Sequence, residues 1–170
     1  MGRRRYNRAV SRIYTLRDAD AIVPDIAVVV QRLRDLRDEV IALRDATRLR
    51  EAVLEAEFGL APGKPGQGTA PAADQAKQAA DVGEAADHDA ELLRLRLRTR
   101  GLVDQMQAEA AWLDERDIVL RDISTGLLDF PAVDRGRPIW LCWRLGEGSI
   151  TAWHLQDEGF AGRRPIHELS

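Results

Sequence analysis

A run of apolar residues in the first third of the chain, spaced alternately by four and three positions, most constrains what this sequence can form. Steps of four and three return to the same face of an α-helix, as in the seam of a coiled coil. Thr15 and Asp18 have the spacing of an N-terminal helix cap. We therefore predict one long helix over residues 15–58, with a kink or a restart at Pro24, because proline has no amide hydrogen. The seam residues are Ile22, Ile26, Val29, Leu33, Leu36, Val40 and Leu43.

A second helical seam follows a break in the pattern. Residues 59–80 hold four glycines and three prolines and no periodic apolar face, so we expect a flexible linker there. Beyond it, Asp81 and Glu84 have the spacing of a capping box, and a new seam predicts a helix over residues 81–113. Two helices of similar length joined by one linker predict an antiparallel hairpin. The second seam consists of Leu92, Leu95, Leu102, Met106 and Leu113.

Each predicted helix also carries a second apolar stripe beside its seam. A helix pair that buries its two seams against each other leaves such flanking stripes uncovered. They require either the C-terminal part of the chain or a second copy of the protein, and we expect a homodimer. The stripes are Val23, Val30 and Ile41 on the first helix, and Leu93 and Leu97 on the second.

From Asp117 onward the apolar period changes to two, which is typical of β-strands. Short turns that contain glycine separate the strands and favour an antiparallel meander. The expected fold class is α+β: a long antiparallel helical hairpin, coiled-coil-like, plus a small C-terminal antiparallel β-sheet of about four strands. Residues 117–170 form the meander and a C-terminal loop, and residues 1–14 form a basic tail and a short strand. The predicted strands cover 118–123, 127–133, 139–145 and 150–155.

Polar side chains gather in the last predicted hairpin and in the loop after it. Glu147 lies in a turn between two glycines, where it either meets a ligand or forms an ion pair with Arg144 or Arg163. His154 is either a hydrogen-bonded structural residue or a base. The loop 159–163 either binds an anion through its backbone amides and its arginine or simply reverses the chain. The candidate ligand-binding residues are Asp129, Glu147, His154 and Arg163.

The single cysteine, Cys142, is the obvious candidate nucleophile. Pairing Leu145 with Ile150 across the last hairpin places Cys142 opposite Trp153 and puts His154 on the other side of the sheet. That register excludes a cysteine–histidine nucleophile–base pair, so we expect a buried core thiol.

A metal site is the other chemistry that these side chains offer. Zinc is bound by about four nitrogen, sulfur or carboxylate ligands. The available donors show no paired-ligand spacing, so we expect no cofactor and keep zinc as the alternative. The candidate ligands are Cys142, His154 and Glu147, with Asp129 as a further donor.

Segments such as Leu141–Glu147 and Gly159–Arg163 resemble the bacterial family DUF2203, a domain of unknown function. The opening Tyr14-Thr15-Leu16, followed later by Pro24, is also similar to that family. The resemblance implies a cytoplasmic bacterial protein of this architecture, and it implies no activity. The matching segments are Gly126–Pro131, Leu141–Glu147, Ile150, Trp153-His154 and Gly159–Arg163.

Charge and composition narrow the possible partners. The formal net charge is -3, and no apolar run reaches the roughly 20 residues that span a bilayer, so we expect no membrane contact. A single cysteine fits a cytoplasmic protein. The leading expectation is a non-catalytic interaction or scaffold module that acts as a homodimer. The alternative is a small-molecule or anion-binding protein, or an enzyme, that uses Glu147, His154 and the Arg163 loop. A third expectation is weak nucleic-acid association through the tail residues Arg3, Arg4, Arg5 and Arg8.

Overall fold

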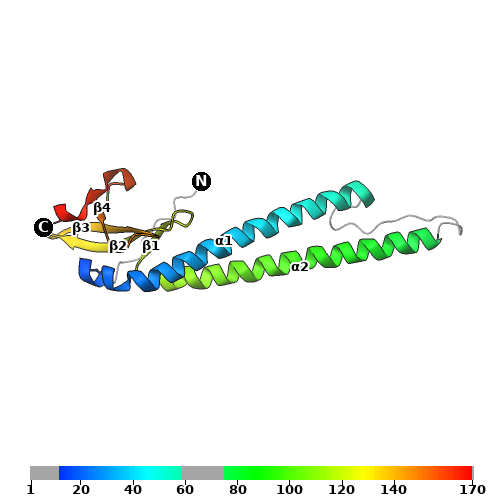
Figure 1. Cartoon of the computed structure of the whole chain (residues 1–170), viewed down its shortest axis with the longest axis horizontal. Coiled ribbons are helices and arrows are strands. Elements are labelled where there is room, and N and C mark those ends of the chain that lie inside the picture. Colours follow the sequence, from blue (N-terminus) through cyan, green and yellow to red (C-terminus); the bar gives the residue numbers. More distant parts are fainter. Residues whose placement is uncertain (1–11, 59–74, 170) are drawn as a thin grey trace. The chain divides into compact units, whose positions relative to one another are not determined.

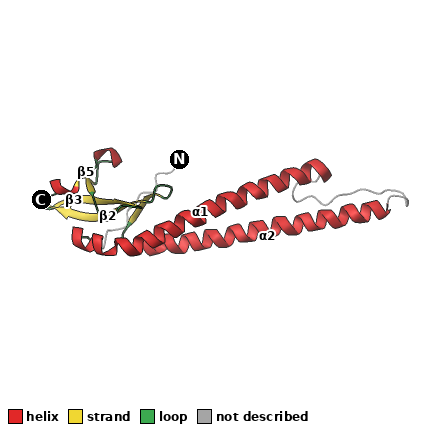
Figure 2. Ribbon diagram, viewed as in Figure 1, coloured by secondary structure: helices red, strands yellow, loops and turns green. Residues whose placement is uncertain are grey.

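A computed structural model describes residues 12–58 and 75–169 (Figure 1). The chain divides into two compact units. The sheet unit comprises Met1–Asp35 and Met106–Ser170, and the hairpin unit comprises Leu36–Gln105. Helices and an antiparallel sheet together confirm the α+β class (Figure 2). No helix in the described part of the chain is long and apolar enough to cross a membrane.

Helix α1 spans Leu16–Phe58, and its beginning is the capped start that the sequence predicts. The Thr15 hydroxyl donates to the Asp18 carboxylate at 2.7 Å, and the Asp18 N–H donates to the Thr15 hydroxyl oxygen at 3.1 Å. These bonds satisfy groups that a helix end leaves without intrahelical partners. Pro24 lies inside α1, and the helix continues through it without a restart.

Helix α2 spans Gln75–Asp114 and so begins before the expected Asp81. The remainder of the predicted linker, residues 59–74, lies outside the described residues. In the hairpin unit, Arg96 pairs with Glu51 at 2.7 Å and Arg98 pairs with Glu39. The α1 residue with the higher number thus pairs with the α2 residue with the lower number, as an antiparallel pair requires. The buried apolar residues of this unit include Leu36, Val40, Leu43, Leu54, Leu92 and Leu102.

The sheet has five strands in sequential order, each antiparallel to the next. The meander is therefore as predicted, with a two-residue strand added after the fourth. The strands are β1 (Val119–Asp122), β2 (Leu127–Asp134), β3 (Arg137–Arg144), β4 (Ala152–Leu155) and β5 (Arg164–Pro165).

One face of the sheet forms the core of the sheet unit together with helical residues. Strand alternation places Phe130, Leu141 and Trp153 on this face, and all three are buried. Val23 and Val30 of α1 belong to the same cluster, so the sheet covers part of the apolar stripe predicted for the first helix. The other stripe residues lie in the hairpin unit and are exposed: Ile41 by 40%, Leu93 by 57% and Leu97 by 60%.

The register between β3 and β4 differs from the predicted one. Cys142 pairs with Ala152, and Trp140 pairs with His154, so the predicted pairing of Cys142 with Trp153 is wrong. A shift of one residue moves side chains to the opposite face, and here it brings Cys142 and His154 to the same face. The expected separation of these two side chains is therefore also wrong.

Leu145 and Ile150 form their backbone hydrogen bonds with other parts of the sheet unit instead of pairing with each other. The Leu145 N–H donates to the Gly126 carbonyl at 3.1 Å, toward β2 rather than β4. The Ile150 N–H donates to the Asp20 carboxylate of α1 at 2.7 Å. A turn then closes between Arg144 and Glu147, whose N–H donates to the Arg144 carbonyl at 3.0 Å. Contacts with β2 and α1 thus determine how the last hairpin closes.

Candidate functional site

The sheet face that points away from the hydrophobic core carries a buried polar cluster. Asp129 on β2, Cys142 on β3 and His154 on β4 are exposed by only 2%, 1% and 4%. One ligand atom from each, a carboxylate oxygen, the thiol sulfur and a ring nitrogen, lies within 4.8 Å of the others. Asp129 lies directly opposite Cys142 across the β2–β3 ladder. Three neighbouring strands therefore bring together three chemically different side chains.

Asp129 is the centre of this cluster. Its Oδ2 accepts a hydrogen bond from the Arg121 Nε at 2.6 Å and lies 3.2 Å from the His154 Nε2. Because Asp129 is almost wholly buried, its negative charge requires close positive or hydrogen-bonding partners. Arg121 supplies one from β1, and its guanidinium carbon lies 4.9 Å from the centroid of the Trp140 ring. The arginine is thus held both by an ion pair and by an aromatic ring.

Arg121 is not among the candidate residues that the sequence pattern indicates. The β1–β2 register shifts between Leu120 and Asp122, and Arg121 lies at this irregularity. Bulges of this kind change the direction of a side chain, and their position depends on the partner strand. The only local signal is the turn after β1, where Asp122 accepts hydrogen bonds from Ser124 and Thr125. That signal predicts a turn and does not identify the arginine beside Asp129.

Cys142 is unsuited to act as a nucleophile in the metal-free chain. Burial raises the pKa of its thiol far above the ordinary value, and the negative charge of Asp129 raises it further. The nearby Arg163 guanidinium lowers the thiol pKa by a smaller amount. Since the thiolate is the reactive form, a neutral and inaccessible thiol does not support cysteine-protease chemistry. Strand register is not the reason, because Cys142 and His154 share a face.

Glu147 and Arg163 form a second pair. The Glu147 carboxylate lies 3.7 Å from the Arg163 guanidinium, and both side chains are largely buried. The same carboxylate accepts the Arg144 N–H at 2.9 Å, and the Glu147 carbonyl accepts the Trp143 ring N–H at 2.9 Å. These contacts support a structural role, in which Glu147 holds its turn and the C-terminal loop together.

The four predicted ligand-binding residues line two different pockets. Asp129 and His154 line a pocket of about 200 Å³ together with Arg121. Glu147 and Arg163 instead line a shallow depression of about 450 Å³ together with Arg164. The first pocket holds the buried ionisable groups and is completed by Leu127, Gln156, Glu158 and Gly159. We therefore take the first pocket as the candidate site.

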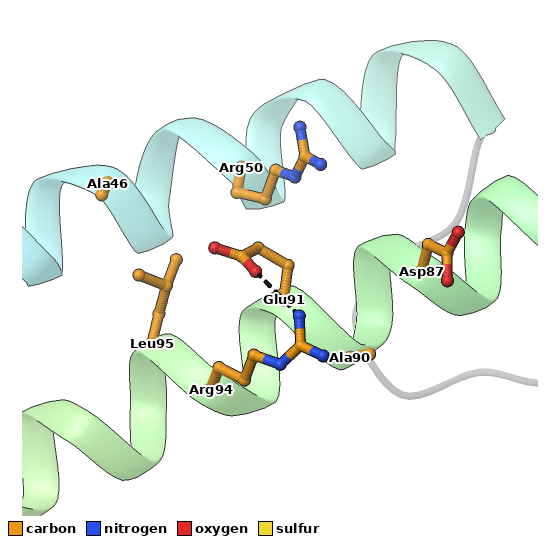
Figure 3. Close-up of a pocket in the computed structure, with 7 residues that line it drawn as sticks. All are labelled: Ala46, Arg50, Asp87, Ala90, Glu91, Arg94 and Leu95. Carbon is orange, nitrogen blue, oxygen red and sulfur yellow. Dashed lines mark hydrogen bonds and ion pairs between the residues drawn. The ribbon is translucent and has the colours of Figure 1, made fainter.

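The hairpin unit has a pocket of its own between its two helices, of about 540 Å³ (Figure 3). Arg50 lines it from α1, and Glu91 points from α2 toward the space between the helices (Figure 3). Glu91 pairs with Arg94 at 3.4 Å, and the Arg94 side chain is 77% exposed. Long charged side chains over solvent are an ordinary helix surface and give no fixed binding geometry. This pocket is the weaker candidate.

Comparison with known proteins places the chain in a family without an assigned activity. The family described as "Uncharacterized conserved protein (DUF2203)" matches residues 12–166. The match spans both helices and the five strands of the sheet. Neither the curated proteins nor the solved structures gave a match to this chain.

Proposed function

This chain belongs to the DUF2203 family, and we propose that it binds a small carboxylate-bearing molecule in the pocket beside Arg121. One observation carries the proposal: the Arg121 guanidinium is held in place at the pocket by Asp129 and Trp140. Its side chain is still 40% exposed. A guanidinium that is both fixed and accessible is prepared to bind a ligand without a large loss of side-chain entropy.

The hydrogen-bonding pattern of Arg121 favours a carboxylate. Its Nε–H donates a hydrogen bond to the Asp129 carboxylate at 2.6 Å. Among the described residues, no hydrogen bond involves its two terminal nitrogens. Those nitrogens form an edge that matches the two oxygens of a carboxylate, as in bidentate arginine–carboxylate pairs. The ion pair with Asp129 therefore orients the arginine and leaves this edge for a second partner.

The rest of the pocket limits the size of that partner. A volume of about 200 Å³ lies below the range of roughly 300–1,000 Å³ typical of pockets for drug-sized ligands. Glu158 is paired with Arg164 at 2.9 Å, so its charge is balanced. Gln156 is exposed and offers an amide to the polar part of a ligand. A small mono- or dicarboxylate fits these limits.

Calorimetric titration with a panel of small carboxylates, and with inorganic phosphate and sulfate, tests the proposal. We expect at least one carboxylate to bind, and Arg121→Met to weaken that binding by at least about tenfold, since charge-assisted hydrogen bonds contribute about 1.5–3 kcal/mol. Arg100→Met, on the exposed surface of α2, is the matched control and should leave binding unchanged. Equal binding by wild type and Arg121→Met, or no binding by any carboxylate, contradicts the proposal.

The second candidate function is that of a homodimeric interaction module. The observation that favours it is the exposed pair Leu93 and Leu97, one helical turn apart on α2. A second copy of the chain would bury this pair. We expect light scattering at micromolar concentration to give a dimer, and Leu93→Glu with Leu97→Glu to give a folded monomer. A monomeric wild type contradicts this candidate.

Two earlier expectations remain predictions. The arginine tail proposed to associate with nucleic acid falls on residues 1–11, outside the described residues. The location in a bacterial cytoplasm rests on composition and on the family resemblance alone.

A further inference from the structure

We infer that Asp129, Cys142 and His154 form a binding site for one divalent transition-metal ion of the zinc class. The three side chains are each at least nine-tenths buried, come from adjacent strands, and present three different donor atoms within 4.8 Å of one another. The inference shares Asp129, its bond with Arg121 and the 200 Å³ pocket with the carboxylate proposal, but its test, stoichiometric metal binding, does not require that a carboxylate binds.

The hydrogen bonds of His154 point to a positive charge beside its Nε2. Its Nδ1 lies 2.7 Å from the carbonyl oxygen of Leu155, which can only accept, so Nδ1 must carry a hydrogen. Its Nε2 lies 3.2 Å from Asp129 Oδ2, which already accepts the Arg121 Nε–H. A neutral His154 would therefore direct the Nε2 lone pair at a carboxylate oxygen in a buried site. Such an arrangement is repulsive and needs a positive charge, either a proton or a metal ion, between Nε2 and Oδ2.

Either a second proton or a metal ion can supply that charge. Only a metal ion would also bind the Cys142 sulfur. A proton on Nε2 would satisfy His154 and Asp129 without forming any bond to the Cys142 sulfur. The Cys142 sulfur lies 3.9 Å from the Trp140 carbonyl oxygen, and the neighbouring Asp129 and Arg163 side chains also interact with the thiol. A metal ion uses all three donors. The Nδ1–H bond to a backbone carbonyl is also the usual way in which proteins orient a metal-binding histidine.

The donor types determine the class of ion. Magnesium and calcium prefer oxygen ligands, whereas a thiolate and an imidazole favour zinc or another late first-row ion. With ion–ligand distances of about 2.0–2.3 Å, tetrahedral ligand atoms lie about 3.3–3.8 Å apart. The observed limit of 4.8 Å thus requires small side-chain rotations and no movement of the strands.

Three protein ligands leave one tetrahedral position unfilled. Asp129 and His154 line the 200 Å³ pocket, so this position is supplied with water or a small ligand from there. A site with three protein ligands and one exchangeable position is the arrangement of catalytic rather than structural zinc. Thiolate and carboxylate would balance the charge of a divalent ion, and Arg121 would orient the carboxylate from outside the coordination sphere.

The test is titration of chelator-treated full-length protein with zinc sulfate and cobalt chloride. We expect one zinc ion per chain with a Kd at or below the micromolar range. Cobalt should give a thiolate-to-cobalt charge-transfer band. Cys142→Ser should abolish that band, and His154→Gln should weaken zinc binding by at least about 100-fold. His167→Gln replaces an exposed histidine and is the matched control.

Circular dichroism of each variant separates lost binding from lost folding. Since Cys142 is small and buried, Cys142→Ala provides a second variant that should fold and bind zinc more weakly. Two results would overturn the inference. One is a folded wild type that binds no stoichiometric zinc or cobalt. The other is nitrogen NMR of the wild type in excess zinc that still shows hydrogens on both ring nitrogens of His154, the pattern of an imidazolium–carboxylate pair.

Discussion

The carboxylate of Asp20, in the second turn of α1, accepts a hydrogen bond from the backbone N–H of Ile150 at 2.7 Å. Ile150 is buried and lies in the connection between β3 and β4. This bond links the start of the helix to the hairpin that carries Cys142 and His154. The position of the candidate site therefore depends on a residue far away in the sequence.

Removal of that bond should destabilise the sheet unit. Asp20→Ala leaves the Ile150 amide without its partner, and we expect a loss of about 1–3 kcal/mol in the free energy of unfolding. Asp25→Ala removes an exposed carboxylate from the same helix and serves as the control. Urea denaturation of the two variants measures the difference. Equal stability of Asp20→Ala and Asp25→Ala would show that the bond contributes nothing.

Gly126 should tolerate no side chain. Its φ is 65°, and a Cβ there would lie 2.6 Å from the Leu145 Cβ and 2.9 Å from the Val30 Cγ1. Gly136 has a similar φ of 77° and nothing within 4 Å, so Gly136→Ala measures the backbone strain alone, about 1–2 kcal/mol. Gly126→Ala should cost about 1–3 kcal/mol more, because the core must also shift. Thermal or urea unfolding of both variants compares them directly, and equal losses would refute the steric account.

Asp122 should make stability depend on pH in the acid range. Hydrogen bonds from the Ser124 hydroxyl and backbone, and from Thr125, lower the pKa of the Asp122 carboxyl below its ordinary value. The folded state therefore favours the ionised form. The resulting stabilisation is present above the unfolded pKa of about 3.9 and is lost as the pH falls through the folded pKa.

Comparison of wild type with Asp122→Asn tests this prediction. The wild type should be the more stable protein at pH 7, and its advantage should shrink toward pH 2. Urea midpoints measured at several pH values give the comparison. Asp25→Asn, which alters an exposed carboxylate without these hydrogen bonds, should show no such trend.

The Cys142 thiol should react slowly in the folded protein. Burial and Asp129 both raise its pKa, and its exposure is 1%. In the presence of a chelator, we expect a thiol-reactive disulfide reagent to modify Cys142 on the order of 100-fold more slowly in the folded than in the urea-unfolded chain. The absorbance of the thiolate released from the reagent measures both rates. Similar rates in the two states would mean that the cluster opens readily.

Local sequence patterns determined most of the fold. The spacing of apolar residues by four and three is sufficient to place α1, because helical periodicity depends only on near neighbours in the chain. The Thr15–Asp18 cap and the glycine turns between strands are local in the same sense. The change to period two likewise located β2 and β3 to within a few residues. Gln75 shows the limit of such patterns, since α2 begins in a segment without an apolar seam.

Tertiary structure alone decided how the candidate site is assembled. Sequence spacing selected Asp129 and His154, but the face of the sheet on which Cys142 lies depends on register, and a shift of one residue reverses it. That register follows from the contact of Asp20 with Ile150 and from the Leu145–Gly126 bond. The place of Arg121 beside Asp129 depends on an irregularity in the β1–β2 ladder. The strand pattern is encoded locally, whereas the buried Asp129–Cys142–His154 cluster is a product of long-range packing.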